Sequence, residues 1–255
     1  MEKNDHRVTM AEHHLASLLV ENTPLRLVEP GIYSVLPDSG SGNEYDTRFG
    51  IFYDRVACHP LYNRLIWGYA VALFPEMADE ALRSSGEGNV LDLGCGSLAF
   101  TADVYSRWSG RPVVLADQSL KMLRMGKARI VGQRCRMPEN LVFLQADALR
   151  LPFRENAFQA VLCQNLLHCL ADTGPLLAGL EKILSENGRM YFTTLVKAGR
   201  LADRYLDALA KNGKLVARTA SDHQAIFDRL GLPGEYAVAG NMLSIRLENG
   251  RTQSN

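Results

Sequence analysis

Short apolar runs alternate with stretches of helical periodicity along the central part of the chain. Five such runs predict strands, at residues 90–93, 113–116, 141–144, 160–163 and 190–195. Because strands that are apolar along their whole length are buried on both faces, this pattern predicts a parallel sheet between two layers of helices. The stretches of helical periodicity that supply those layers fall at about 97–108, 119–136 and 174–185.

The N-terminal part of the chain carries helical patterns instead. Two aromatic-rich helices are predicted at 45–57 and 61–74, and the turn-rich stretch PDSGSGN at 37–43 precedes them as a hinge. We therefore expect an N-terminal helical lid, residues 1–85, in front of a second domain, residues 86–255.

The pattern changes again after the fifth strand. Helices are predicted at 201–209 and 223–230, followed by two candidate strands at 236–238 and 242–247. The dipeptide Gly240-Asn241 between these strands is a turn signal. The tail therefore predicts an antiparallel hairpin on the edge of the sheet.

Composition and charge limit the partners of this protein. The 255 residues are 47% hydrophobic and 22% charged, and Lys+Arg and Asp+Glu number 28 each, so the formal charge is zero. Without a basic field we expect no nucleic-acid partner, and a small-molecule substrate fits better. The apolar run at 15–20 is too short for a membrane span or a signal peptide, so we expect no membrane partner and a cytoplasmic protein.

Cysteine usage predicts neither disulfides nor a metal site. The five cysteines are scattered and include no C-x-x-C pair, which is typical of reduced thiols. The histidines and cysteines show no spacing typical of metal ligands, and we expect no metal.

The first central strand runs into a glycine turn, NVLDLGCGSLAF at 89–100. Gly94 and Gly96 permit strained dihedrals and a close approach of a ligand to the main chain, and the next helix offers backbone N–H groups. An isolated G-x-G is equally explained by a structural turn. The sequence after the glycine turn is therefore needed to distinguish a nucleotide site from a purely structural turn.

Two acids stand at the ends of the next two strands. Asp117 lies about 20 positions after Gly94, where nucleotide-binding folds place the carboxylate that binds ribose hydroxyls. Asp147 is placed to accept a hydrogen bond from an adenine amino group. The alternative is that Asp117 caps the next helix, a task that Ser119 can also perform. A glycine turn followed by two strand-end acids is much rarer than any one of these features.

Together these stretches resemble the class I methyltransferases that use S-adenosylmethionine. The resemblance covers about residues 86–196, and the chain looks most similar to small-molecule enzymes of the ubiquinone/menaquinone-biosynthesis type. It implies a Rossmann-like α/β fold with a seven-stranded, mostly parallel sheet, helices on both faces, an antiparallel C-terminal strand and an N-terminal helical lid. The matching segments are VLDLGCGS (90–97), VVLADQSLKML (113–123), LVFLQADALRLPF (141–153), FQAVLCQNLLHCL (158–170) and ILSENGRMYFTTL (183–195).

The resemblance also implies a role for each matched residue. Asp92 holds the methionine end of S-adenosylmethionine, while Gly94 and Gly96 pass close to the adenosyl group. Asp117 matches the ribose-binding acid. The other cofactor-binding residues are Gln118 beside the adenine, Asp147 and Ala148 at the adenine edge, and the main chain at Cys163 and Gln164 facing the methionine amine.

The lid carries a pre-motif of the same family, YD…YD…N…G. It is matched by Tyr45-Asp46, Tyr53-Asp54, Asn63 and Gly68. The resemblance places Tyr45 and Tyr53 over the cofactor, where a tyrosine face near the sulfonium gives a cation–π contact. Both are therefore candidate catalytic residues.

Two polar residues after the fourth strand are further catalytic candidates. His168 is the natural proton acceptor for an oxygen or nitrogen nucleophile, and its alternative role is a helix-start histidine bonded to backbone. Asn165 orients a ligand or caps the following turn.

Two positions depart from the family pattern. Gln159 stands where many relatives carry Asp, in a turn. Leu98 replaces the third small residue of the glycine turn. Leu98 either packs the glycine loop against the sheet or narrows the pocket around the methionine chain.

Three functions remain open at this point. The first is a small-molecule methyltransferase of biosynthesis or secondary metabolism, acting on an O, N or C nucleophile and releasing S-adenosylhomocysteine. The second is cyclisation of S-adenosylmethionine to azetidine-2-carboxylate, with release of methylthioadenosine. The third is a non-catalytic protein that binds S-adenosylmethionine. The sequence leaves a homodimer open.

Overall fold

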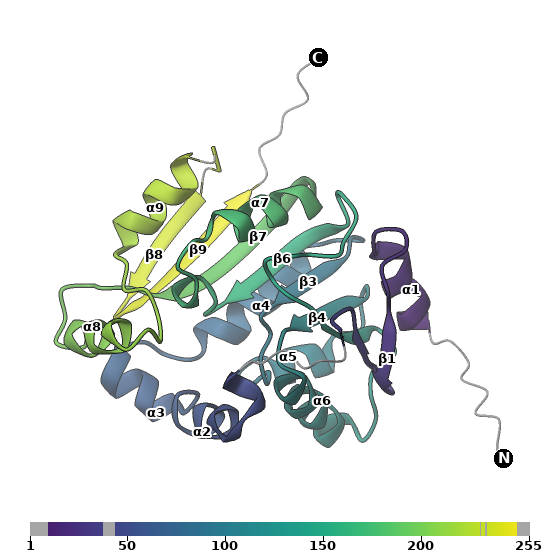
Figure 1. Cartoon of the computed structure of the whole chain (residues 1–255), viewed down its shortest axis with the longest axis horizontal. Coiled ribbons are helices and arrows are strands. Elements are labelled where there is room, and N and C mark those ends of the chain that lie inside the picture. Colours follow the sequence, from purple (N-terminus) through teal and green to yellow (C-terminus); the bar gives the residue numbers. More distant parts are fainter. Residues whose placement is uncertain (1–9, 38–43, 230, 233, 249–255) are drawn as a thin grey trace.

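One nine-stranded sheet runs through the described part of the chain, in the order β1-β2-β5-β4-β3-β6-β7-β9-β8 (Figure 1). The computed structural model describes residues 10–37, 44–229, 231–232 and 234–248. The strands are β1 Arg26–Glu29, β2 Ile32–Ser34, β3 Val90–Leu93, β4 Val113–Asp117, β5 Leu141–Gln145, β6 Phe158–Gln164, β7 Leu184–Leu195, β8 Gly234–Ala239 and β9 Met242–Glu248.

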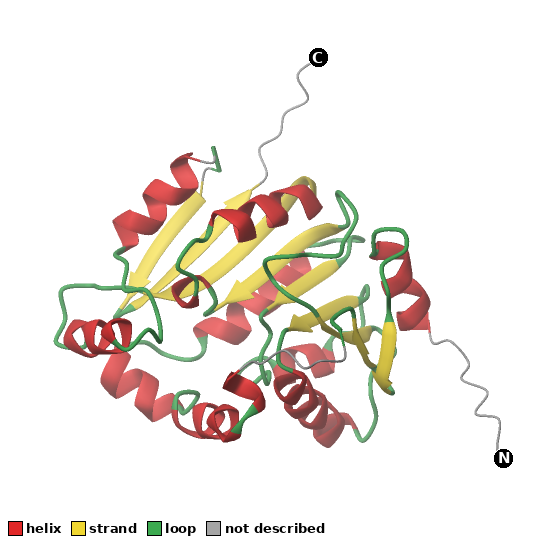
Figure 2. Cartoon of the chain, viewed as in Figure 1, coloured by secondary structure: helices red, strands yellow, loops and turns green. Residues whose placement is uncertain are grey.

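Helices lie on both faces of this sheet (Figure 2). We call residues 44–67, which hold η1, α2, α3 and η2, the cap segment. The α-helices are α1 Met10–Leu18, α2 Arg48–Val56, α3 Pro60–Tyr62, α4 Leu73–Ser84, α5 Ala102–Arg107, α6 Leu120–Arg134, α7 Gly174–Ile183, α8 Asp203–Lys211 and α9 Ala220–Arg229. Two 3₁₀ turns, η1 Glu44–Asp46 and η3 Leu167–Cys169, and one π-helix, η2 Asn63–Trp67, complete the set.

The centre of the sheet is parallel, as the apolar runs predicted. β5, β4, β3, β6 and β7 pair in parallel with one another in this order, so their carboxyl ends meet at one edge. The predicted C-terminal hairpin is confirmed, because β9 pairs antiparallel with both β7 and β8.

Two strands lie where the sequence predicted only helices. β1 and β2 form a hairpin around Gly31, and β2 pairs in parallel with β5. The expected seven-stranded sheet is therefore present as β3 to β9, with β1 and β2 added outside β5. The expected lid of residues 1–85 is consequently not all-helical. β2 has only three residues, which is too short for the hydrophobic pattern to show a period.

Each face of the sheet has its own hydrophobic core. Leu180 of α7 belongs to the core that also includes residues of α1 and α9. Leu123 of α6 belongs to the opposite core, with residues of α4 and α5. Neighbouring residues of β4 enter different cores, Val114 the first and Leu115 the second. This alternation explains why the central strands read as continuously apolar.

Some predicted helices are shorter than the sequence pattern indicated. The helices at 119–136 and 174–185 are confirmed as α6 and α7, but the one predicted at 97–108 begins only at Ala102. Leu98 has a φ of 54°, in the left-handed region, and so cannot continue a right-handed helix. The helix predicted at 61–74 ends at η2, because Gly68 has a φ of 74°.

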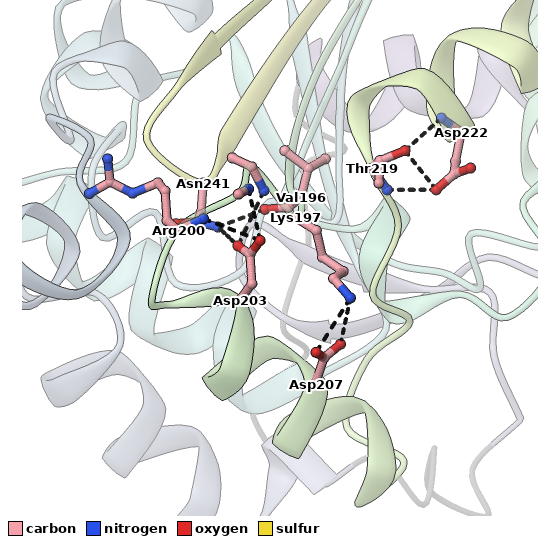
Figure 3. A network of polar contacts seen from close by, with 10 residues as sticks. Val196, Lys197, Arg200, Asp203, Asp207, Thr219, Asp222 and Asn241 are labelled. Carbon is pink, nitrogen blue, oxygen red and sulfur yellow. Dashed lines mark hydrogen bonds and ion pairs between the residues drawn. The ribbon is translucent and has the colours of Figure 1, made fainter.

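Trp67, at the end of the cap segment, is attached to the C-terminal hairpin by a hydrogen bond and by apolar packing with Met242. The backbone N–H of Asn241, at the hairpin tip, donates to Trp67 O at 2.8 Å. The side-chain Nδ2 of Asn241 donates to Val196 O at 2.9 Å and to Asp203 Oδ1 at 2.6 Å (Figure 3). Asp203 in turn accepts from Gly199 N at 2.8 Å. The end of the cap segment, the hairpin tip and the loop after β7 therefore form one polar network.

Candidate functional site

A cavity of about 570 Å³ opens where the parallel strands end. Its wall combines the loops after β3, β4, β5 and β6 with Tyr45 and Cys58 of the cap segment. The wall includes no histidine, lysine or arginine among the described residues. Eight of the nine predicted cofactor-binding residues line it, namely Asp92, Gly94, Gly96, Asp117, Gln118, Asp147, Ala148 and Gln164.

The glycine turn forms the floor between β3 and α5. Gly94 and Gly96 have φ values of 73° and 57°, which L side chains rarely adopt. A Cβ added at Gly96 would meet no heavy atom within 4 Å, while one at Gly94 would approach Leu166 Cδ2 to 3.4 Å. Dihedral strain, rather than a clash, is therefore what requires glycine here. The open space above Gly96 leaves its backbone accessible from the cavity.

Asp117 ends β4 with both carboxylate oxygens on backbone donors. Gly96 N donates to Oδ2 at 2.9 Å, and Ser119 N donates to Oδ1 at 2.8 Å. Burial raises the pKa of this carboxyl to about 6, against the lowering effect of those two bonds. The helix-cap alternative for Asp117 is not needed, because Ser119 Oγ accepts from Met122 N at 3.2 Å and so caps α6. The carboxylate retains lone pairs for hydroxyl groups of a ligand.

Asp92 is buried in β3, two residues before Gly94. Its Oδ2 accepts from Tyr105 OH at 2.7 Å, and its Oδ1 is buried without a hydrogen-bond partner among the described residues. Burial raises the pKa of the Asp92 carboxyl to about 7. A buried carboxylate oxygen without a donor, in a cavity wall, fits a cationic or N–H-bearing ligand group.

The ends of β5 and β6 bring polar groups to the same wall. Asp147 lines it beside Ala148, and its Oδ1 accepts from Leu149 N at 2.9 Å. Gln164 donates from Nε2 to Phe74 O at 3.1 Å, which ties β6 to α4. Cys163, predicted to face the cofactor through its main chain, is completely buried in the core and is not part of the wall.

Asn165 is one of the two candidate catalytic residues that line the cavity, and Tyr45 is the other. Asn165 has a φ of 58°, in the left-handed region, and its backbone N–H donates to Thr193 O at 2.8 Å. Its side-chain Oδ1 is buried without a hydrogen-bond partner among the described residues. The side chain therefore does not cap the following turn, and its oxygen can accept from a ligand.

His168 does not line the cavity, which corrects its expected place as a proton acceptor there. Its ring lies 6% exposed, with Nδ1 3.2 Å from Thr194 Oγ1 and 3.3 Å from Leu195 N. Burial lowers the pKa of His168 to about 4, with His223 and Arg218 adding to the effect. The alternative role, a histidine bonded to the backbone, is the one that the contacts support.

The pre-motif residues of the cap segment mostly make structural contacts. Asn63 donates from Nδ2 to Ala57 O at 2.8 Å and to His59 O at 2.9 Å, and Gly68 ends η2. Tyr45 lines the cavity, whereas the side chain of Tyr53 lies outside the described part of the structure.

Several wall residues were not found from the sequence. Phe74 of α4 and Phe100 of the glycine loop stack with ring centroids 4.8 Å apart, and both line the cavity with Cys58. They come from three separate segments, each of which reads locally as ordinary apolar sequence. Only the tertiary fold brings them together.

Comparison with known proteins agrees with this geometry. Residues 91–192 match the family model described as a methyltransferase domain. The ubiquinone/menaquinone biosynthesis C-methyltransferase of Vibrio cholerae is 25% identical over 233 residues, which span 82% of this chain and 88% of that protein. Over residues 91–192 the chain thus matches a methyltransferase domain, and the relatives support an S-adenosylmethionine-dependent methyltransferase of the class I type.

Solved structures of methyltransferases share the fold. An S-adenosylmethionine-dependent methyltransferase from Aquifex aeolicus superposes with a TM-score of 0.57 at 14% identity, over 78% of this chain and 97% of that one. The geranyl diphosphate C-methyltransferase of Streptomyces coelicolor, in complex with S-adenosylhomocysteine, gives a TM-score of 0.57 at 12% identity, over 83% of this chain and 99% of that one. These superpositions show that this chain has the fold of solved S-adenosylmethionine-dependent methyltransferases.

Two further findings concern metal ions and membrane spans. Among the described residues no group of three or more His, Cys, Asp or Glu side chains is placed to hold a metal ion. No described helix is both long and apolar enough to cross a membrane.

Proposed function

We propose that this methyltransferase methylates a small molecule inside the cavity, with the cap segment acting as a lid. The observation that carries the proposal is the composition of the cavity wall. It combines the glycine turn and three strand-end acids, Asp92, Asp117 and Asp147, with Tyr45 and Cys58 of the cap segment. A site built from both parts can hold the cofactor and exclude water when the cap segment is closed.

The residues of the wall fit S-adenosylmethionine. We assign the ribose hydroxyls to Asp117 and the methionine amine to the buried oxygens Asp92 Oδ1 and Asn165 Oδ1, which have no partner among the described residues. The glycine turn passes along the adenosyl group. The adenine edge is assigned to Gln118, Asp147 and Ala148, and the main chain near the methionine end to Gln164.

The chain contributes mainly by positioning its ligands. When bound, S-adenosylmethionine supplies an electrophilic methyl group on a sulfonium, which is already an excellent leaving group. The residues of the site therefore need to align the acceptor in line with that methyl group and to exclude water. We assign Tyr45 a cation–π contact with the sulfonium. His168 takes no proton from the acceptor, because it does not reach the cavity.

The acceptor side of the wall favours an uncharged molecule. Cys58, Phe74 and Phe100 are apolar or neutral, and the wall has no cationic side chain among the described residues to pair with an anionic acceptor. The relatives are named C-methyltransferases. Among carbon, nitrogen and oxygen nucleophiles, carbon acceptors are therefore the first to test.

Product identification decides between the proposed reaction and cyclisation. The purified protein is incubated with S-adenosylmethionine alone and then with a panel of neutral aromatic and enolic acceptors. We expect S-adenosylhomocysteine only when an acceptor is present. Methylthioadenosine and azetidine-2-carboxylate formed without an acceptor would establish the cyclase instead. Tight binding without either product would support a non-catalytic protein.

The assignment of the ribose site has its own test. Asp117→Ala removes an acceptor of charged hydrogen bonds and should weaken S-adenosylmethionine binding by roughly 1–3 kcal/mol in calorimetry. Asp79→Ala, at an exposed ion pair with Arg83 on α4, is the matched control and should bind as the unaltered protein does. Equal affinity in the two variants would contradict the assignment.

A further inference from the structure

The two aspartates of the cap pre-motif point to residues far away in the sequence. Asp54 of α2 accepts hydrogen bonds from Ser97 Oγ, in the glycine loop, and from Arg129 Nη2, on α6, at 2.5 Å. Arg129 also donates from Nη1 to Ser97 O at 2.5 Å. The Asp54 side chain is only 8% exposed in this ion pair. The three groups form a closed triangle between the cap segment, the glycine loop and α6.

Asp46 makes a second link, at the start of α6. Its Oδ1 accepts from Ser119 Oγ at 2.7 Å and from Lys121 N at 3.1 Å. Lys121 Nζ also donates to Thr47 O in the cap segment. The cap segment therefore holds the N-terminus of α6 as well as the glycine loop.

Both links end beside the same carboxylate. Asp117 receives its two backbone hydrogen bonds from Gly96 N and Ser119 N. Ser97, the partner of Asp54, directly follows Gly96, and Ser119 is itself the partner of Asp46. The cap segment is thus attached at Ser119 itself and at Ser97, the residue next to Gly96, so both attachments adjoin the donors that orient Asp117.

We propose that Asp46 and Asp54 are positioning residues that couple closure of the cap segment to the orientation of the Asp117 carboxylate. The inference rests on the proposed role of Asp117 in cofactor binding. The YD…YD pre-motif then has two functions. Its tyrosines were expected at the cofactor, and its aspartates orient Asp117 through Ser97 and Ser119. Because coupling is reciprocal, cofactor binding favours the closed cap segment as much as the closed cap segment favours binding.

Burial of the Asp54–Arg129 ion pair explains why its loss should weaken the attachment of the cap segment. Loss of one member of the Asp54–Arg129 pair leaves the other charge partly buried without compensation, whereas an exposed pair contributes little. An isosteric change to asparagine keeps the volume and removes the charge. It should therefore loosen the cap segment without opening a void in the core.

The first measurement is the affinity for S-adenosylmethionine by calorimetry. Asp54→Asn and Asp46→Asn should each weaken binding by about tenfold. Asp79→Asn, at the exposed Asp79–Arg83 pair, should leave affinity unchanged. Ser97→Ala, which keeps the Asp54–Arg129 pair, serves if Asp54→Asn fails to fold, and it should also weaken binding. Unchanged affinity in the folded cap variants would overturn the inference.

A double-mutant cycle separates positioning from a general effect on the cap segment. If Asp54 acts through Asp117, then Asp54→Asn should cause little further loss when Asp117 is already alanine. Fully additive losses would show that Asp54 supports the cap segment independently and would overturn the inference. If Asp117→Ala alone leaves binding unchanged, the proposed ribose site is wrong. A loss with Asp117→Ala but none with Asp46→Asn or Asp54→Asn refutes only the coupling.

Discussion

At the scale of single residues, two buried carboxyls control how the site responds to pH. Burial raises the pKa of Asp92 to about 7 and that of Asp117 to about 6 in the cofactor-free protein. S-adenosylmethionine carries positive charge and therefore prefers the ionised form of both. Its affinity should fall as the pH decreases from about 8 to 5, at most about tenfold per unit for each proton involved. Calorimetry across this range measures the change.

The variant Asp92→Asn assigns the upper step of that profile. Without the ionisable group, affinity should be lower at pH 8 and should lose its dependence on pH near 7. The step near pH 6 should remain, because Asp117 is unaltered. A profile that keeps both steps would show that Asp92 is not the titrating group.

Leu98 shows how one residue can combine strain with packing. It has a φ of 54°, is 1% exposed and lies so close to Gly126 that a Cβ there would be 3.1 Å from Leu98 Cγ. Leu98 shares a core with Leu115 and Phe143 of the sheet, as the first alternative expects, and it also lines the cavity, as the second expects. Leu98→Ala should lower the free energy of unfolding by roughly 2–5 kcal/mol in urea titration. Leu98→Met, which conserves volume, should cost less than about 1.5 kcal/mol.

At the scale of elements, the buried histidine of α9, His223, sets a different response to pH. Neither ring nitrogen of His223 on α9 has a hydrogen-bond partner among the described residues, and burial lowers the pKa of His223 to about 4. In the unfolded chain this histidine takes up a proton near pH 6.5, whereas in the folded protein it stays neutral down to about pH 4. His223 therefore destabilises the fold progressively as the pH falls from 6.5 to 4.

His223→Leu should remove this penalty. Between pH 6.5 and 4 the unfolding free energy of the variant should depend on pH less steeply, by about 1.4 kcal/mol per unit. Asp92 and Asp117 act in the opposite sense, because a raised carboxyl pKa costs stability as the pH rises from 3.8 toward 6 or 7. Both carboxyls are present in each protein, so the difference between the two urea titrations reports His223 together with its effect on the pKa of the neighbouring His168. Parallel pH profiles would contradict this account.

The elements also show how far the sequence could predict the fold. β3 to β6 and α6 were predicted within a few residues, and strands buried on both faces leave a strong local pattern, whereas β7 begins at Leu184, six residues before the predicted start. The three-residue β2 and the interruption at Gly68 were missed, because such short features have no period. The eight wall residues predicted from motifs lie at strand ends, which a parallel sheet brings to one edge.

The residues that sequence reasoning missed depend on tertiary contacts. Asp54 lies 43 positions before Ser97 and 75 before Arg129, so no local sequence pattern predicts their contact. His168 was misplaced for the same reason, since its partner Thr194 is 26 positions away on β7. Motifs therefore located most of the cavity wall, and only the fold revealed which contacts hold the cap segment to it.

At the scale of the whole molecule, the cap segment is attached at its two ends to different parts of the protein. Asp46 and Asp54 hold its first part to α6 and the glycine loop, and Trp67 holds its end to the hairpin tip at Asn241. Tyr45 and Cys58 of the same segment line the cavity. If the cap segment acts as the proposed lid, we expect its opening to break the Asp46 and Asp54 contacts.

The hairpin of β1 and β2 has a consequence for the whole molecule beyond its place in the sheet. β5, with the sequence LVFLQ, is buried along its whole length and would be an outer strand without β2. Its unpaired backbone would then be a template for another chain. The actual outer strand, β1, has only four residues, and Glu29 at its end is held by Arg124 and Lys127 at 3.0 Å each.

Removal of the first 35 residues should therefore cause self-association rather than a simple loss of stability. We expect the shortened protein to form β-rich aggregates that light scattering and thioflavin fluorescence detect at micromolar concentration. Removal of residues 1–9 alone is the control and should leave a protein of normal solubility. A short N-terminal hairpin thus keeps the most apolar strand of this methyltransferase from recruiting other chains.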